Sequence, residues 1–208
     1  YQTHWPDHDM RYEDTLRALD ELVQSGKVRI LGCSNETTWG LTKSLGVSER
    51  EGLARYETIQ NNFSLNNRRF EDELAQACRQ ENVSLIPYSP LAGGVLSGKY
   101  NDNQLPDKAR FSHYLSAGKK RQKLMAQRFV NERSIESTKR FQVIAAELEM
   151  SPVTMATAWS KQHDFVASTI VGATSTEQLD DILLASELTL DAETMKKINA
   201  VSRDILYP

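Results

Sequence analysis

Val28-Arg-Ile-Leu-Gly-Cys33 is a short, mostly apolar run that ends at the polar pair Ser34 and Asn35. Residues 13–25, just before it, place leucines at helical spacing, and Gly26 suits the end of that helix because glycine tolerates a left-handed turn. A second, weaker helical pattern follows at Thr37–Leu45. Short apolar runs bounded by turn residues are typical of buried parallel strands, so we expect a helix, a strand and a helix in succession.

The same alternation continues along the chain. Further strands are predicted at the extreme N-terminus up to about His4, at Thr58–Gln60 with its flanks, at Val83–Tyr88 and at Val166–Val171. Further helices are predicted at Phe70–Asn82, at Ser137–Leu148, from Ser151-Pro152 onward, at Thr176–Ala185 and at Ala192–Val201. Strands that alternate with helices, with about 27 to 30 residues between the first four strands, indicate βαβ units and a parallel sheet.

Two α/β architectures fit this alternation. The regular strand spacing favours a (β/α)8 TIM barrel, and a doubly wound sheet is the main rival. A barrel takes eight βα units and typically ~250 residues, whereas five units are found here. We therefore expect residues 1–208 to form the C-terminal portion of a single barrel domain, about strands 4–8 with their helices. The first residue, Tyr1, is not an initiator methionine, and this fits a truncated chain.

The composition is that of an ordinary globular protein. The 208 residues are 39% hydrophobic and 25% charged, and the net charge of −3 is too mild to indicate a nucleic-acid or membrane partner. Two cysteines, Cys33 and Cys78, cannot form a disulfide framework and favour a reducing, cytoplasmic compartment. No apolar run is long enough to span a membrane.

One segment interrupts the alternation. From Leu96 to about Glu136 the chain is polar, rich in Lys, Arg, Asn and Ser, and longer than an ordinary βα loop. Loops of this length are usually functional or disordered. In a barrel this one would lie over the C-terminal face, where active sites form.

Five motifs in order carry a resemblance to a known family. They are His4-Trp5-Pro6, Gly26-Lys27-Val28-Arg29, Gly32-Cys33-Ser34-Asn35, Tyr88-Ser89-Pro90-Leu91-Ala92-Gly93-Gly94 with Ser97-Gly98-Lys99-Tyr100, and Gly172-Ala173-Thr174 through Gln178. In this order and spacing the chain resembles the aldo-keto reductase family, and the stretch Phe165–Gln178 is most similar to the bacterial Tas-like branch. The resemblance covers the chain from the family's fourth barrel strand onward. It implies an NADPH-dependent oxidoreductase that reduces aldehyde and ketone carbonyls by hydride transfer.

The resemblance also implies how the catalytic residues are distributed. The family uses an Asp, a Tyr that donates the proton, a Lys that lowers the pKa of that Tyr, and a His. Only the His has a counterpart here, His4, which is expected to orient the substrate carbonyl; alone, it would more often be a strand-end histidine satisfied by backbone. The other three precede the fourth strand, so we expect the fragment alone to be inactive. Two alternatives remain, a non-catalytic nucleotide-binding subunit similar to potassium-channel β subunits and an inactive truncated fragment.

The nicotinamide end of the cofactor is assigned by the resemblance to residues at strand ends. Ser34, Asn35 and Gln60 are implied to hydrogen-bond the carboxamide, since amide side chains both donate and accept. Alternatively, Ser34 or Asn35 caps the helix that begins near Thr37. Tyr88 is implied to stack on the nicotinamide ring. Small neighbours would let the backbone approach the pyrophosphate; the predicted contacts are Ser89, Pro90, Leu91 and Gly93.

The phosphate end is assigned to two later segments. Lys99 and Arg110 are implied to contact phosphate and the adenosine end, since cations suit phosphate and Arg suits planar contacts; the alternative is a solvated basic loop. Ser175–Gln178 has the pattern of a capping box, and a helix N-terminus binds anions. The implied 2′-phosphate and adenine contacts are Gly172, Thr174 and Gln178, and the alternative for Gln178 is a cap partner only. Asp181 matches an acidic position of the family's cofactor site. Ile182 stands where the family often has Asn, which weakens the preference for NADPH over NADH.

Other conspicuous residues are interpreted as structural. Met155 and Trp159 lie four apart on a predicted helix and are expected in the core, and Cys33 is expected to be a small buried packer. His8, His113 and His163 show no metal-ligand spacing. The expected partner is a small carbonyl substrate, with an oligomer left open.

Overall fold

The computed structural model describes residues 1–103 and 105–208, and the chain divides into two compact units. Unit 1 consists of Tyr1–Asn62, Arg69–Tyr88 and Asp164–Ser168, and unit 2 consists of Phe63–Arg68, Ser89–His163 and Thr169–Pro208.

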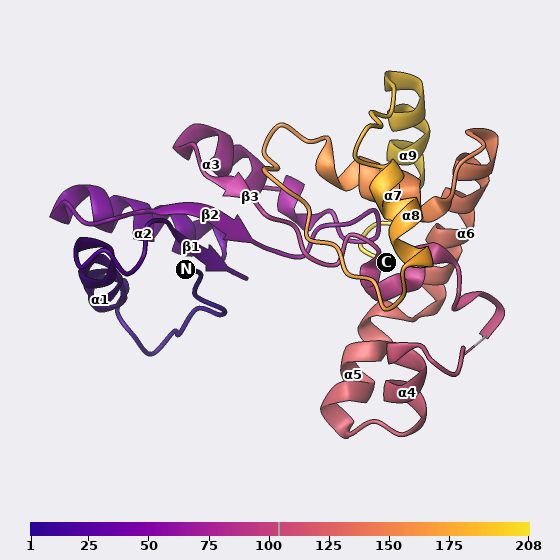
Figure 1. Ribbon diagram of the computed structural model, residues 1–208, viewed down its shortest axis with the longest axis horizontal. Coiled ribbons are helices and arrows are strands. Elements are labelled where there is room, and N and C mark those ends of the chain that lie inside the picture. The colour runs from indigo at the N-terminus through magenta and orange to yellow at the C-terminus, as the bar shows by residue number, and fades with distance from the viewer. Residues whose placement is uncertain (104) are drawn as a thin grey trace. The chain divides into compact units, whose positions relative to one another are not determined.

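Unit 1 is built on a parallel sheet with the strand order β1-β2-β3 (Figure 1). The strands are β1 (Leu31–Ser34), β2 (Tyr56–Gln60) and β3 (Ser84–Leu85). In this register Ser34 pairs with Gln60 and Ile59 pairs with Leu85. The α/β class and the parallel sheet are therefore confirmed, although β1 begins later than predicted and β3 is shorter.

The two outer predicted strands pair with this sheet only at single bridges. On the N-terminal side, the Thr3 amide donates to the Gly32 carbonyl at 3.0 Å and the Gly32 amide donates to the Tyr1 carbonyl at 2.8 Å. On the other side, Val166 pairs with Leu85. The prediction of a strand over Val166–Val171 is wrong in its extent, because the chain becomes largely exposed after Val166 and pairs with no described strand beyond the Leu85 bridge.

Three α-helices accompany the sheet of unit 1. They are α1 (Tyr12–Gln24), α2 (Thr38–Glu51) and α3 (Leu74–Glu81), with a short 3-10 helix η1 (Arg69–Glu71) before α3. Gly26 has a left-handed φ of 73° just after α1, as predicted. The cap of α2 is Thr37, whose Oγ1 accepts from the Gly40 amide at 3.0 Å, so the alternative that Ser34 or Asn35 caps this helix is wrong.

Unit 2 is helical. Besides short 3-10 turns it contains α4 (Arg110–Ser116), α5 (Lys120–Phe129), α6 (Glu132–Glu147), α7 (Pro152–Lys161), α8 (Glu177–Leu184) and α9 (Ala192–Asp204). The predicted start of α7 is confirmed, since the Ser151 hydroxyl accepts from the Val153 amide at 3.1 Å. Met155 and Trp159 are fully buried, as predicted for core residues. Helix α6 begins earlier than predicted because Asn131 caps it.

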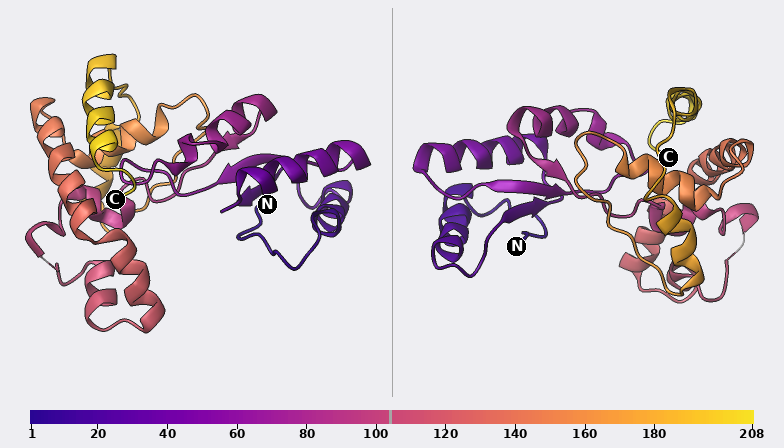
Figure 2. Two further views of the ribbon diagram at one scale, coloured as in Figure 1. Left: turned by 180° about the vertical axis from the view of Figure 1, so that it is seen from behind. Right: turned by 45° about the horizontal axis from the view of Figure 1, so that its top comes forward.

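The expectation of a long loop from Leu96 to Glu136 is wrong for most of that segment. It contains α4, α5, the start of α6 and two 3-10 turns, η2 (Ala92–Ser97) and η3 (Asn101–Asn103). Phe111 is fully buried and stacks on Phe129, with 5.2 Å between ring centroids. A few large aromatic residues hold α4 against α5, and they are too sparse to form a helical pattern. The two helices form a hairpin and lie side by side in Figure 1 and in the rear view of Figure 2.

None of the described helices combines the length and the apolar character that crossing a membrane requires.

Candidate cofactor-binding site

The first group of predicted site residues lies where the strands of unit 1 end. Ser34 is the last residue of β1, Gln60 is the last residue of β2, and Tyr88 follows β3. Because parallel strands in register end at one edge of a sheet, these residues come together there. In open α/β sheets this edge is where ligands bind.

Asn35 is the centre of a hydrogen-bond network at this edge. Its side-chain amide donates to the His4 carbonyl at 2.9 Å and to the Ser34 hydroxyl at 3.1 Å. Its side-chain oxygen accepts from the Tyr88 hydroxyl at 2.7 Å. The Ser34 hydroxyl in turn donates to the Gln60 carbonyl at 2.6 Å. All five residues predicted for this part of the site are thus brought together.

The backbone of Asn35 is also unusual. Its φ is 57°, a left-handed conformation that asparagine adopts more readily than most residues. The Asn35 amide donates to the Gln60 carbonyl at 3.0 Å, which extends the β1–β2 ladder past the end of β1. Backbone strain of this kind gathers at functional sites, where the surrounding structure holds it in place.

Two further residues of this edge, Gln2 and Thr58, were not predicted. The Gln60 side-chain amide donates to the Gln2 side-chain oxygen at 2.6 Å, and the Gln2 amide donates to the Thr58 hydroxyl at 3.0 Å. Gly32 lies beneath them, where a Cβ would collide with both side chains. The only sequence signal for this part of the site was Gly32, and the sequence alone does not show which side chains lie close to it.

His4 enters the network through its main chain. Its carbonyl accepts from Asn35, while its imidazole is exposed beside Trp5, with 5.9 Å between ring centroids. The exposed His4 ring is available to a ligand, but the hydrogen bond from Asn35 fixes the His4 backbone and not its ring.

A buried carboxylate supports the same turn. Glu36 is 5% exposed and accepts from the Tyr12 hydroxyl at 2.5 Å, and its carbonyl accepts from the Asn61 side chain at 3.2 Å. Burial, followed by the hydrogen bond to Glu36, raises the pKa of Tyr12. The phenol therefore stays protonated and ties α1 to the residue after Asn35.

The second group lies in unit 2, on a segment with repeated left-handed backbone. Ser89, Ala92, Gly93 and Gly94 have φ values of 56°, 49°, 66° and 95°. The Ala92 amide donates to the Ser89 carbonyl at 2.8 Å, and the Gly94 amide donates to the Leu91 carbonyl at 2.8 Å. This coiled backbone contains the predicted residues Ser89, Pro90, Leu91 and Gly93.

Two cations gather over the glycines of this segment. A Cβ on Gly94 would lie 2.7 Å from both Cε and Nζ of Lys99, and a Cβ on Gly93 would collide with the Phe111 ring and lie 3.2 Å from Nη2 of Arg110. Burial, followed by the charge of Arg110, lowers the pKa of Lys99. Among the described residues neither cation has a carboxylate partner, so a bound anion would offset the repulsion between them.

The third group lies at the start of α8 in unit 2. The Gln178 side-chain oxygen accepts from the Thr174 amide at 3.0 Å and from its hydroxyl at 3.3 Å. The predicted capping box over Ser175–Gln178 is wrong, since the N-cap, Thr176, is in helical conformation and makes no side-chain cap. Gln178 instead reaches one residue further back. Gly172 is exposed with open space around it.

Asp181 has a structural partner in this group. Its carboxylate accepts from the Ser151 hydroxyl at 2.9 Å, which joins α8 to the start of α7. Asp181 is partly exposed.

The cysteines take no part in these groups. Cys33 and Cys78 are free and buried, and burial raises the pKa of both thiols, to about 12 for Cys78. Buried thiols of raised pKa are poor nucleophiles, and this agrees with the structural interpretation of Cys33. Within the part of the chain that the structure describes, no group of three or more His, Cys, Asp or Glu could hold a metal ion.

Comparison with known proteins places these residues in a family. The model of the aldo/keto reductase family matches residues 1–203. The chain belongs to the aldo/keto reductase family. The prediction made from the five motifs is confirmed.

Individual proteins similar to this chain are consistent with its membership of the aldo/keto reductase family. The chain is 34% identical to "Protein tas" of Escherichia coli (strain K12), over 100% of the chain and 62% of that protein. It is 29% identical to "Uncharacterized oxidoreductase YrpG" of Bacillus subtilis (strain 168), over 97% of the chain and 57% of that protein. It is also 29% identical to the "Probable voltage-gated potassium channel subunit beta" of Oryza sativa subsp. japonica, over 95% of the chain and 60% of that protein. The chain thus spans less than two thirds of each relative.

Proposed function

We propose that this chain forms the cofactor-binding part of an NADPH-dependent oxidoreductase that reduces aldehyde and ketone carbonyls. The observation that carries the proposal is the network around Asn35 at the carboxyl ends of parallel strands, in a chain that belongs to the aldo/keto reductase family. A cytoplasmic location is part of the proposal, because both cysteines are free thiols.

The fold proposed for the whole domain is a (β/α)8 barrel. The strand segments of unit 1 support it because they pair in the order in which they occur, from Gln2 through β1, β2 and β3 to Val166. A doubly wound sheet reverses its strand order at a switch point, and the paired segments show no such reversal. In barrels the active site lies at the carboxyl ends of the strands, where the Asn35 network is found.

The nicotinamide end is assigned to the network of unit 1. Asn35 and Gln60 offer amide donors and acceptors of the kind that a carboxamide requires, and Ser34 adds a hydroxyl. Tyr88 is assigned to the face of the ring, with its hydroxyl held by Asn35. The bound cofactor supplies a hydride; these residues hold the ring that carries it and exclude water around it.

The phosphate end is assigned to unit 2. Lys99 and Arg110 offer two positive charges over a glycine backbone that a phosphate can approach closely. The chemistry of this donor set fits a phosphate group. The segment with Ser89, Pro90, Leu91 and Gly93 is assigned to the pyrophosphate, and Gly172, Thr174, Gln178 and Asp181 are assigned to the adenosine end and its 2′-phosphate.

The carbonyl substrate is assigned to the exposed ring of His4, which would hydrogen-bond the carbonyl oxygen. In the family a Tyr protonates this oxygen, and a Lys and an Asp act with that Tyr. No residue of this chain is assigned to these three roles. Carbonyl reduction is therefore proposed for a protein that carries the complete catalytic set, whereas cofactor binding is proposed for the residues of this chain.

A second candidate function is a nucleotide-sensing partner subunit. The similarity to the potassium channel subunit beta of Oryza sativa favours it. Turnover of a carbonyl substrate separates the two functions, since a sensing subunit binds NADPH with little or no turnover.

A fluorescence titration with NADPH tests the proposal. Saturable binding that Lys99→Met and Asn35→Ala both weaken is expected. An absence of saturable binding would remove both functions.

A further inference from the structure

Residues 108–131 carry a charge pattern that differs from the rest of the chain. They contain seven of the 25 Lys and Arg residues and none of the 28 Asp and Glu residues. The rest of the chain is therefore acidic overall. The seven cations are Lys108, Arg110, Lys119, Lys120, Arg121, Lys123 and Arg128.

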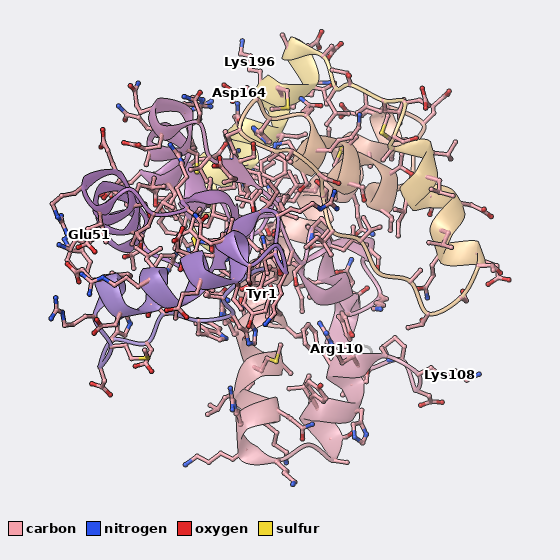
Figure 3. All side chains as sticks on the ribbon, turned by 60° about the vertical axis from the view of Figure 1, so that its left-hand side comes forward. Tyr1, Glu51, Lys108, Arg110, Asp164 and Lys196 are labelled. Atoms are coloured by element: carbon pink, nitrogen blue, oxygen red, sulfur yellow. The ribbon has the colours of Figure 1, made fainter. Side chains whose placement is uncertain are left out.

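These seven cations are exposed on the α4–α5 hairpin or beside it. Among the described residues, none of them forms an ion pair. Figure 3 shows Arg110 at the start of α4 and Lys108 on the segment that leads into it, reaching away from the helix. Elsewhere in the chain exposed cations are repeatedly paired, as Arg79 is with Asp164 and Lys139 is with Asp102, both at 2.7 Å.

The hairpin is fastened to the glycine segment by aromatic residues. Phe111 occupies the space where a Cβ of Gly93 would lie, and it stacks on Phe129 of α5. The Phe111 amide donates to the hydroxyl of buried Tyr100 at 3.3 Å. Tyr100 directly follows Lys99 and Phe111 directly follows Arg110, so these contacts fasten the hairpin at the end that carries Lys99 and Arg110.

We propose that the α4–α5 hairpin is an electrostatic steering surface that attracts the polyphosphate of the cofactor toward Lys99 and Arg110. The inference rests on the proposed function, because it takes the phosphate end to be bound there. One sign of unpaired charge beside a binding site raises the local concentration of the oppositely charged ligand and speeds its association. The other six hairpin cations act before binding, whereas Lys99 and Arg110 contact the bound phosphate.

An anionic membrane is the main alternative occupant, because Leu124 and Met125 are 59% and 43% exposed on α5. A helix that lies in a membrane interface presents a broad apolar face opposite its charged one. On α5 the exposed apolar residues are these adjacent two, and Ala126 faces the interior. The continuity with Arg110 therefore favours the phosphate ligand.

Stopped-flow association of NADPH tests the steering surface. The test variant combines Lys120→Gln, Arg121→Gln and Lys123→Gln, which removes three cations that contact no described site residue. The matched control combines Lys196→Gln, Lys197→Gln and Arg203→Gln, which removes three exposed cations from α9. We expect the α5 variant to associate about five- to tenfold more slowly at low ionic strength, with an unchanged dissociation rate. The control should change less than twofold, and the variants should converge near 0.5 M salt, where screening is nearly complete.

Three outcomes would overturn the steering surface. An unchanged association rate in the α5 variant removes it while leaving saturable binding, and so the proposed function, intact. If the α5 variant and the α9 control associate equally slowly, the slower association comes from the change in net charge and not from the hairpin. Loss of binding to vesicles of anionic lipid, with NADPH association unchanged, assigns the hairpin to a membrane instead. If the unsubstituted protein fails to bind NADPH at all, the proposed function fails as well.

Discussion

The two groups assigned to the ends of the cofactor are built in different ways. At the strand ends of unit 1, neutral side chains are cross-linked by hydrogen bonds around Asn35. On the glycine segment of unit 2, two cations that form no ion pair with a described residue lie over a coiled backbone. Neutral hydrogen bonds fix orientation and respond little to salt, whereas unpaired charge supplies affinity that salt screens. The first group is thus suited to orient a ring, and the second to bind an anion.

Removal of Lys99 should have the largest effect on affinity. Lys99→Met keeps an unbranched side chain and removes the charge, so NADPH should bind roughly 10- to 100-fold more weakly, the loss of a charge-assisted contact. The dissociation constant, measured by fluorescence at low and high salt, should also lose part of its salt dependence. A salt dependence equal to that of the unsubstituted protein would contradict a phosphate contact at Lys99.

Gly94→Ala should displace the Lys99 side chain by adding a methyl group to the backbone beneath it. The new methyl group would lie 2.7 Å from the end of the Lys99 side chain, so NADPH should bind about tenfold more weakly. Because the φ of this residue is 95°, the free energy of unfolding should fall by roughly 1–3 kcal/mol. Gly46→Ala is the control, since Gly46 lies within α2 with nothing near its Cβ position. It should stabilise by up to ~1 kcal/mol and leave NADPH affinity unchanged. Equal effects of the two substitutions would show that Gly94 has no special position.

Asn35 tests the neutral group. Asn35→Ala removes three side-chain hydrogen bonds and strains a φ of 57°, whereas Asn35→Gly removes the bonds without the strain. Both should weaken NADPH binding by about tenfold, and their salt dependence should match that of the unsubstituted protein. Asn35→Gly should be the more stable of the two in a thermal melt. If salt dependence changes as it does in Lys99→Met, the division between a neutral and a charged group is wrong.

Tyr88 should give a graded result. Tyr88→Phe removes one hydrogen bond to Asn35 and should weaken NADPH binding about three- to fivefold. Tyr88→Ala also removes the stacking face and should weaken it further. An unchanged dissociation constant for Tyr88→Ala, from fluorescence titration, would remove this residue from the site.

The pH dependence should be the mildest effect and should follow Lys99. Burial and Arg110 lower its pKa from the usual 10.5 in the free protein, and a bound phosphate would raise it again. Affinity is therefore full at pH values below the free-protein pKa of Lys99 and falls as the pH rises through it, so the decline begins below pH 10.5. The affinity of adenosine 2′,5′-bisphosphate, followed from pH 7 to 10, should show this decline in the unsubstituted protein and lose it in Lys99→Met. A flat profile would contradict the shift.

The sequence predicted the strand ends well and the helical hairpin poorly. Apolar runs placed Ser34, Asn35, Gln60 and Tyr88 at strand ends, because in a parallel sheet local pattern and burial agree, and the family resemblance implied their role. The role of the His4 carbonyl and the Gln2 bridge depend on which strands are neighbours, and no local pattern encodes that. Helices α4 and α5 were missed because Phe111, Tyr100 and Phe129 hold them by long-range aromatic contacts. At Gln178 the motif was correct in composition, but the hydrogen bond went to Thr174 rather than Ser175.

Equilibrium titration with NADPH and NADH at two salt concentrations tests the central claim most directly. Both cofactors should saturate the protein and should bind more weakly as salt screens Lys99 and Arg110. NADPH carries one more phosphate group than NADH, so it should bind more tightly at low salt and should lose more affinity as the salt concentration rises. Failure to bind either cofactor, or equal affinity for both at every salt concentration, would contradict the account.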